Sequence, residues 1–225
     1  MNKPDMNNFL CQFDFSSLQE LDPGLVDGYN LSYSKEVPFE IRMQEHESKP
    51  QEVGSLDVIC VNIFVLGDEL NAQSIKIVLT SETDLFFHFT QTVNENDFEH
   101  MQNNQKLMIN FSEYLQVLIK MFNSGFKKPK AIFTIKQNGI AQLEFIKNME
   151  YKFIELLVCQ FIKSSDEITK ENITYRYNVI KSKNGIMYNR LKDISILIKT
   201  KNPSLLMQLQ KTASKQMEIF RNKKY

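Results

Sequence analysis

Residues 75–122 read IKIVLTSETDLFFHFTQTVNENDFEHMQNNQKLMINFSEYLQVLIKMF, and this stretch carries strand and helix patterns in close succession. It begins with the alternation that is typical of a half-buried strand. Asn94 is a predicted helix N-cap, because two carboxylates then lie in the first turn, where the helix dipole favours them. Residues 107–111 alternate again and predict a short strand, and Ser112 is expected to cap a second helix.

Strand patterns flank this stretch on both sides. Residues 31–43 contain a clean alternation of apolar and polar side chains, whereas residues 58–66 are nearly all apolar, as in a strand buried on both faces. Three further strands are predicted at residues 131–135, 141–146 and 153–161, with a tight turn at Asn138-Gly139. The sequence therefore predicts an α+β fold: a small antiparallel β-barrel or sandwich with a helix pair packed on one side, followed by a helical C-terminal extension.

The chain of 225 residues has no net charge, but its charges are unevenly distributed. Residues 163–225 carry 14 Lys or Arg and 5 Asp or Glu, a balance of +9, which leaves 13 basic and 22 acidic residues, or −9, before them. This asymmetry favours head-to-tail contacts between copies or polar partners for the tail. A solvated, lysine-rich helix is the alternative.

Three segments follow from these patterns. Residues 1–30 contain Pro and Gly without a sustained period and are predicted to be a flexible N-terminal lead, or alternatively a docking peptide. Residues 31–165 form the predicted head domain. Residues 166–225 form a predicted basic helical extension with a short heptad segment.

The heptad segment predicts a coiled coil through its unbroken 4-3 spacing of apolar side chains. A single asparagine at an a position is typical of seams that select register and dimer state. Gly185 and several β-branched or aromatic residues favour a strand instead, so helix and strand both stay open at this point. The predicted seam consists of Ile173, Tyr177, Ile180, Asn184, Met187, Leu191, Ile194 and Ile198.

Enzyme chemistry is not expected. The chain has three histidines and three cysteines, and none of their spacings matches a metal site. It also lacks a glycine-rich phosphate loop and a nucleophile elbow, so we expect no catalytic residue, metal or cofactor. Cys11, Cys60 and Cys159 are expected to be free thiols in a reducing compartment. No secretory signal or run of about 20 apolar residues is recognisable, so no membrane partner is expected.

Several of these motifs together resemble a known family. Residues 31–41, 77–87, 95–98 and 107–111 are similar to the N-terminal head domain of the spindle assembly abnormal protein 6 family, whose members build the centriolar cartwheel. The proline that usually precedes the Phe-Phe pair is Leu85 here. The resemblance covers roughly residues 31–170, and the heptads are a shorter version of the family's coiled coil. It implies either a truncated chain or a short paralogue that lacks the long rod.

The resemblance also implies a site. In that family the last hairpin of the head carries an exposed aromatic residue, usually phenylalanine, that inserts into a pocket on a second head. Tyr151 occupies this position and is followed by Lys152, as in the family, so Tyr151→Phe is expected to be tolerated. A tyrosine packed on its own barrel rim is the alternative. The implied head-head interface consists of Asn148, Met149, Glu150, Tyr151 and Lys152.

The function implied by the resemblance is that of a non-catalytic, self-assembling structural protein of the centriole or basal body, in the cytoplasm and cytoskeleton. It would form head-to-head and coiled-coil homotypic contacts in a cartwheel-like assembly. Its partners would be itself, as homodimer and higher oligomer, and other centriolar or cytoskeletal proteins. Two alternatives stay open: a nucleic-acid-linked scaffold with the same head architecture that binds phosphates through its basic tail, and a small adaptor.

Overall fold

A computed structural model describes residues 13–44, 54–69, 71–123, 130–136, 138–205, 207–208 and 211. The chain divides into two compact units. One is Ser16–Tyr175, and the other combines Met1–Phe15 with Arg176–Tyr225. The first unit contains the sheet and the helix pair, and it confirms the predicted fold class.

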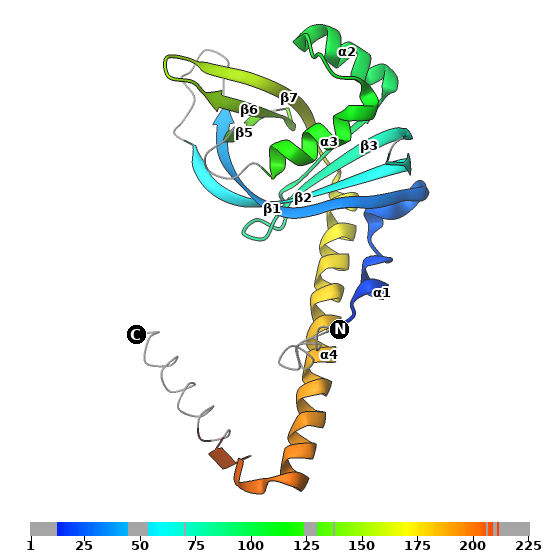
Figure 1. Cartoon of the computed structure of the whole chain (residues 1–225), viewed down its shortest axis with the longest axis vertical. Coiled ribbons are helices and arrows are strands. Elements are labelled where there is room, and N and C mark those ends of the chain that lie inside the picture. The colour runs from blue at the N-terminus through cyan, green and yellow to red at the C-terminus, as the bar shows by residue number, and fades with distance from the viewer. Residues whose placement is uncertain are drawn as a thin grey trace, which may run out of the picture. The chain divides into compact units, whose positions relative to one another are not determined.

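The sheet of this unit is a closed barrel of seven strands (Figure 1). The strand order is β1-β2-β3-β4-β7-β6-β5. Neighbours pair antiparallel except at the closure, where β1 and β5 run parallel. Closure leaves no free sheet edge along most of the circumference. The strands are β1 (Tyr29–Gln44), β2 (Ser55–Asp68), β3 (Asn71–Ser81), β4 (His88–Asn94), β5 (Lys130–Lys136), β6 (Ile140–Asn148) and β7 (Phe153–Lys163).

Aromatic rings fill the inside of the barrel. Phe89 lies edge-on to Phe87, with 4.9 Å between ring centroids, and to Phe133, with 5.1 Å. Phe133 in turn lies 5.8 Å from Phe161 on β7. These ring contacts join β4, β5 and β7 across the interior, which accounts for Phe87 and Phe89, whereas Phe86 is exposed.

The helices α2 (Glu95–Gln105) and α3 (Phe111–Phe122) pack together against one side of the barrel (Figure 1). The predicted N-cap at Asn94 is confirmed. Its side chain accepts a hydrogen bond from the Asp97 N–H at 2.9 Å, and the Asp97 carboxylate accepts one from the Asn94 N–H at 3.2 Å. This reciprocal pair is a capping box, which satisfies two N–H groups that the helix leaves unpaired.

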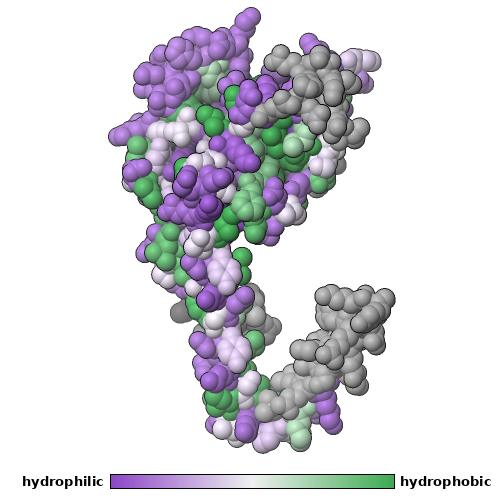
Figure 2. All heavy atoms as spheres, turned by 180° about the vertical axis from the view of Figure 1, so that it is seen from behind, coloured by the Kyte–Doolittle hydropathy of each residue, from purple (hydrophilic) through white to green (hydrophobic). Residues whose placement is uncertain are grey.

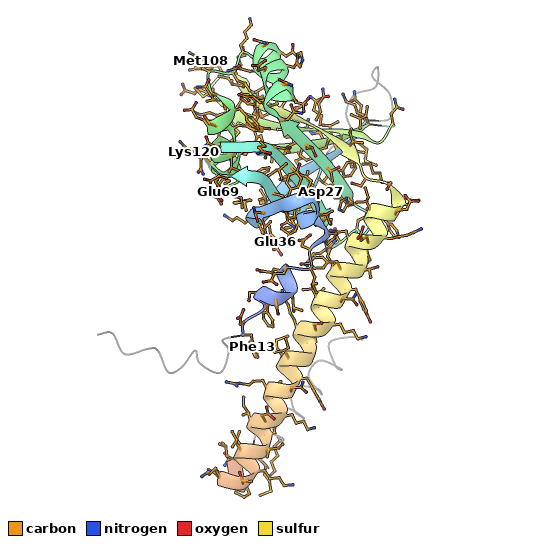
Figure 3. All side chains as sticks on the ribbon, turned by 90° about the vertical axis from the view of Figure 1, so that its right-hand side faces the viewer. Phe13, Asp27, Glu36, Glu69, Met108 and Lys120 are labelled. Atoms are coloured by element: carbon orange, nitrogen blue, oxygen red, sulfur yellow. The ribbon has the colours of Figure 1, made fainter. Side chains whose placement is uncertain are left out.

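The predicted strand at residues 107–111 is wrong, and so is the predicted cap at Ser112. Lys106 has a left-handed φ of 54° that ends α2, and α3 already begins at Phe111, with Asn110 as its N-cap. The Asn110 N–H donates to the Glu113 carboxylate at 3.0 Å. The strand-like alternation of residues 107–109 arises because Leu107 and Ile109 pack on the core. Met108, which is 99% exposed, projects away from this connection between α2 and α3 (Figure 3).

Part of the predicted lead belongs to the barrel unit. The short helix α1 (Ser16–Gln19) and the 3-10 helix η2 (Pro23–Gly28) precede β1. Gly24 lies directly on the ring of Phe64, since a Cβ there would come within 2.2 Å of it. Asp27, labelled in Figure 3, has a φ of 68° that turns the chain into β1. Residues 1–12 of the expected lead lie outside the described residues.

The extension contains the helix α4 (Asp166–Lys201). The alternative that this segment is a strand is therefore wrong. The hydroxyls of Thr174 and Ser195 donate to carbonyls one turn earlier, both at 2.8 Å, so these side chains fit a helix interior. No helix in the described part of the chain is long and apolar enough to cross a membrane. The helical expectation for residues 212–225 lies outside the described residues.

Candidate functional site

The hairpin between β6 and β7 has a two-residue tip. The Met149 N–H donates to the Lys152 carbonyl at 2.9 Å, and the Lys152 N–H donates back to the Met149 carbonyl at 3.4 Å. Glu150 and Tyr151 therefore form the turn itself. The five residues predicted for the head-head interface lie together on this tip.

The tip exposes apolar side chains to an unusual degree for a turn. Tyr151 is 94% exposed, and Met149 (44%) and Phe153 (66%) lie beside it in the chain. Tyr151 therefore does not pack on its own barrel rim, and that alternative is wrong. Figure 2 shows hydrophobic side chains gathered on one face of the barrel as well. Apolar surface of this kind is typical of sites where proteins associate.

A groove of ≈ 980 Å³ lies on the outside of the barrel, where β4 and β7 separate. These strands pair only through Phe89 with Lys163 and Thr90 with Ile162. Beyond that point, the side-chain amide of Gln105 on α2 replaces the missing strand, because it donates to the Val158 carbonyl at 2.8 Å and accepts from the Val158 N–H at 2.9 Å. The walls are parts of β4, α2, β6, β7 and the first turn of α4.

The groove combines exposed apolar residues with acidic ones. Ile140, Ile162 and Ile168 are 42%, 66% and 51% exposed within its lining. Asp97 and Glu155 add carboxylates to its walls. Burial, followed by the charge of Glu155, raises the pKa of the nearby Glu144 carboxyl. The hairpin tip carries Lys147, Glu150 and Lys152, and Lys163 also lines the groove, so both surfaces carry charges of both signs.

The predicted seam residues all lie on α4. Asn184 and four apolar seam residues are exposed, while the other three are partly buried. Figure 2 shows hydrophobic and hydrophilic side chains alternating along this helix. Ile186, Tyr188, Ile196 and Leu197 are also exposed on this helix, so its exposed apolar surface is not confined to the predicted seam. The exposed apolar seam residues are Tyr177, Ile180, Met187 and Leu191.

Other polar groups have structural roles. His88 is buried, and its Nδ1 lies 2.8 Å from the Ser164 hydroxyl, which links β4 to the start of α4. Among the residues that the structure describes, no group of three or more His, Cys, Asp or Glu side chains is placed to hold a metal ion. The sequence did not reveal the groove, because no linear pattern shows where two paired strands separate.

Comparison with known proteins supports the resemblance. The family described as "Centriolar protein SAS N-terminal domain" matches residues 31–161. A spindle assembly abnormal protein 6 homolog from Gallus gallus is 18% identical over 173 residues, which are 72% of this chain and 26% of that protein. The chain thus spans about a quarter of the length of this curated relative.

Solved structures show the same fold. A mutant N-terminal fragment of Leishmania SAS-6, with parts of its coiled coil domain, has a TM-score of 0.64 and 15% identity, over 80% of this chain and 99% of that one. An N-terminal coiled-coil dimer of C. elegans SAS-6 has a TM-score of 0.56 and 11% identity, over 75% and 98%. Since the matched family domain covers residues 31–161, more than half of the sequence, this chain belongs to the family of centriolar SAS proteins.

Proposed function

We propose that this chain is a non-catalytic, self-associating structural protein of the centriole or basal body, whose heads join through the Tyr151 hairpin. The observation that carries the proposal is a tyrosine that is 94% exposed at a hairpin tip. An aromatic ring in that position has no core of its own to fill, and burial in a partner removes its apolar surface from water. The groove between β4 and β7 is the receptor in this proposal.

One strand supplies both halves of the contact. Tyr151 lies two residues before the start of β7, and Glu155, Val158 and Ile162 of that strand line the groove. Two copies related by a two-fold axis can therefore exchange hairpins, each tip entering the groove of the other. Such a self-complementary contact is typical of homodimers.

The second homotypic contact in this proposal is a coiled coil of α4. A head contact and a helix contact with different two-fold axes would propagate into a ring or an open spiral, because a dimer made through one contact still presents the surfaces of the other contact at both ends. One buried tyrosine per tip contributes about 2 kcal/mol at a hot spot. After the entropy of association is subtracted, the head contact should be weak, with a dissociation constant on the order of micromolar or higher.

The test replaces Tyr151 by glutamate in the full chain. Tyr151→Glu removes the aromatic ring and brings a further carboxylate toward Asp97 and Glu155, so it should abolish head-head association and leave the fold intact. Sedimentation velocity at rising concentration measures the association, and circular dichroism measures the fold. Phe86→Glu is a matched control, since Phe86 is 62% exposed on the β3–β4 turn, outside tip and groove.

Comparison of Tyr151→Glu with Phe86→Glu distinguishes a specific contact from nonspecific association of exposed aromatic residues. The control variant should associate as the wild-type chain does. If Tyr151→Glu associates as strongly as wild type, or if it unfolds, then Tyr151 is not the contact residue and the proposal fails.

A further inference from the structure

Two phenylalanines of the N-terminal segment pack beside α4. Phe13 and Phe15 belong to the same compact unit as the part of α4 from Arg176 onward. Their rings stack with 5.7 Å between centroids, and both side chains are half-buried although neither lies in a helix or strand. The Lys183 ammonium of α4 lies 5.3 Å from the centroid of the Phe15 ring, and Figure 3 shows Phe13 next to this helix. The end of the segment that was predicted to be a flexible lead therefore contacts one side of α4.

Lys183 lies on the flank of the predicted seam. With Asn184 at an a position, Lys183 is the g residue before it, and Tyr188 is the e residue that follows. In a parallel two-stranded coiled coil, a g residue of one helix lies beside the following e residue of the other. Tyr188 is 69% exposed and is not a seam residue, so burial of the seam alone does not account for it. The heptad register would bring Tyr188 of a second copy next to Lys183 and Phe15.

The flanks of the seam lack carboxylates for the usual ion pairs between e and g positions. The g positions are Arg176, Lys183, Arg190 and Leu197, and the e positions are Thr174, Lys181, Tyr188 and Ser195. An antiparallel pair would place the basic g residues opposite one another, which favours the parallel arrangement. Aromatic faces attract cations where no carboxylate is present. Lys181 already lies 6.0 Å from the centroid of the Tyr177 ring, as Lys183 lies over Phe15.

We infer that Tyr188 of a second copy packs over Lys183, so that each ammonium lies between that ring and Phe15 of its own chain. The inference rests on the proposed helix contact and makes the N-terminal segment a part of it. Phe15 is a positioning residue in this arrangement. Its contact with Lys183 already exists in the single chain, so a long side chain is ordered before the two copies meet and less entropy is lost on association.

The size of the effect follows from the symmetry of the dimer. One exposed cation–π contact strengthens an equilibrium about threefold. A two-fold dimer contains the Lys183–Tyr188 contact twice, so loss of either side chain should raise the dissociation constant about tenfold. Phe15→Leu should raise it by less, about threefold, because it frees the lysine side chain without removing the contact between the copies.

The experiment is a double-mutant cycle in the full chain. Every variant carries Tyr151→Glu, which removes the proposed head contact and leaves a helix monomer–dimer equilibrium. Sedimentation equilibrium measures the dissociation constants of the parent, Lys183→Gln, Tyr188→Ser and the double variant, at about 1 M salt to screen repulsion between exposed charges. The double variant should be weakened about as much as each single variant, because both substitutions remove the same contact. Tyr188→Phe keeps the ring and should recover most of the affinity that Tyr188→Ser loses.

Ile196→Ser is the matched control on the same helix. Ile196 is 52% exposed at an f position, away from the flanks of the seam, and isoleucine, tyrosine and serine have similar helix propensities. This control should leave the dissociation constant unchanged, and circular dichroism should show the same helix content in every variant.

The outcomes distinguish this inference from the helix contact on which it rests. Phe15→Leu should weaken the dimer when Lys183 is present and have no effect in the Lys183→Gln chain. An equal loss in both chains would overturn the positioning role of Phe15. Fully additive losses of free energy in the double variant, or an unchanged dissociation constant for Tyr188→Ser, would overturn the inference while the helix contact stands. A parent that stays monomeric would refute the helix contact, and the inference falls with it.

Discussion

Cys159 shows how strongly the barrel controls a single residue. Its thiol is fully buried and lies 3.6 Å from the Tyr114 hydroxyl, and burial raises its pKa from 9.0 to about 12. In a variant with serine at positions 11 and 60, iodoacetamide should therefore label Cys159 only after unfolding, because the thiolate is the reactive form. The free energy of unfolding should also fall as pH rises above 9, since the unfolded chain ionises first. Rapid labelling of the native variant, followed by mass spectrometry, would contradict this.

At the scale of elements, α4 carries two neighbouring residues with different expected effects. Asn184→Leu should raise the thermal stability of the helix contact, because it replaces a polar side chain in the seam by an apolar one. It should also make the oligomeric state less uniform, because the asparagine that favours one register and a dimer is lost. Gly185→Ala is the matched control. Among the residues that the structure describes, no atom lies within 4 Å of its Cβ position, and the change should stabilise the helix by about 1 kcal/mol with the oligomer unchanged. Circular dichroism and light scattering measure both properties. Equal masses for all variants would speak against a seam at Asn184.

For the whole molecule, the two proposed contacts should act independently. Light scattering of the full chain should give a mass that grows with concentration for the wild type. Tyr151→Glu alone should stop at a helix dimer, and the pair Tyr177→Glu and Leu191→Glu should stop at a head dimer. All three substitutions together should leave a monomer, because neither contact then remains. A wild-type chain that stays monomeric at high concentration would contradict both contacts.

The sequence by itself determined the features that depend on neighbouring residues. The strand periods at residues 31–43 and 75–79 and the N-cap at Asn94 depend on neighbouring residues, and the structure contains both strands and the cap. For residues 166–200 the sequence left helix and strand open, and the structure decided for the helix. The tip at Tyr151 was also visible, because a large aromatic residue between two strands is conspicuous without any structure. The family resemblance added its expected role as an interface residue, which is still a prediction.

Only the tertiary structure decided the rest. Residues 107–111 bury alternate side chains as a strand does, but the turn at Lys106 and the cap at Asn110 make them a link between helices. From the sequence alone, Gly24 is predicted to lie in a flexible lead, but in the structure it packs directly against the ring of Phe64. The groove exists because β4 and β7 separate and Gln105 bridges to β7. These features depend on contacts between residues far apart in the chain, and local sequence patterns do not encode such contacts.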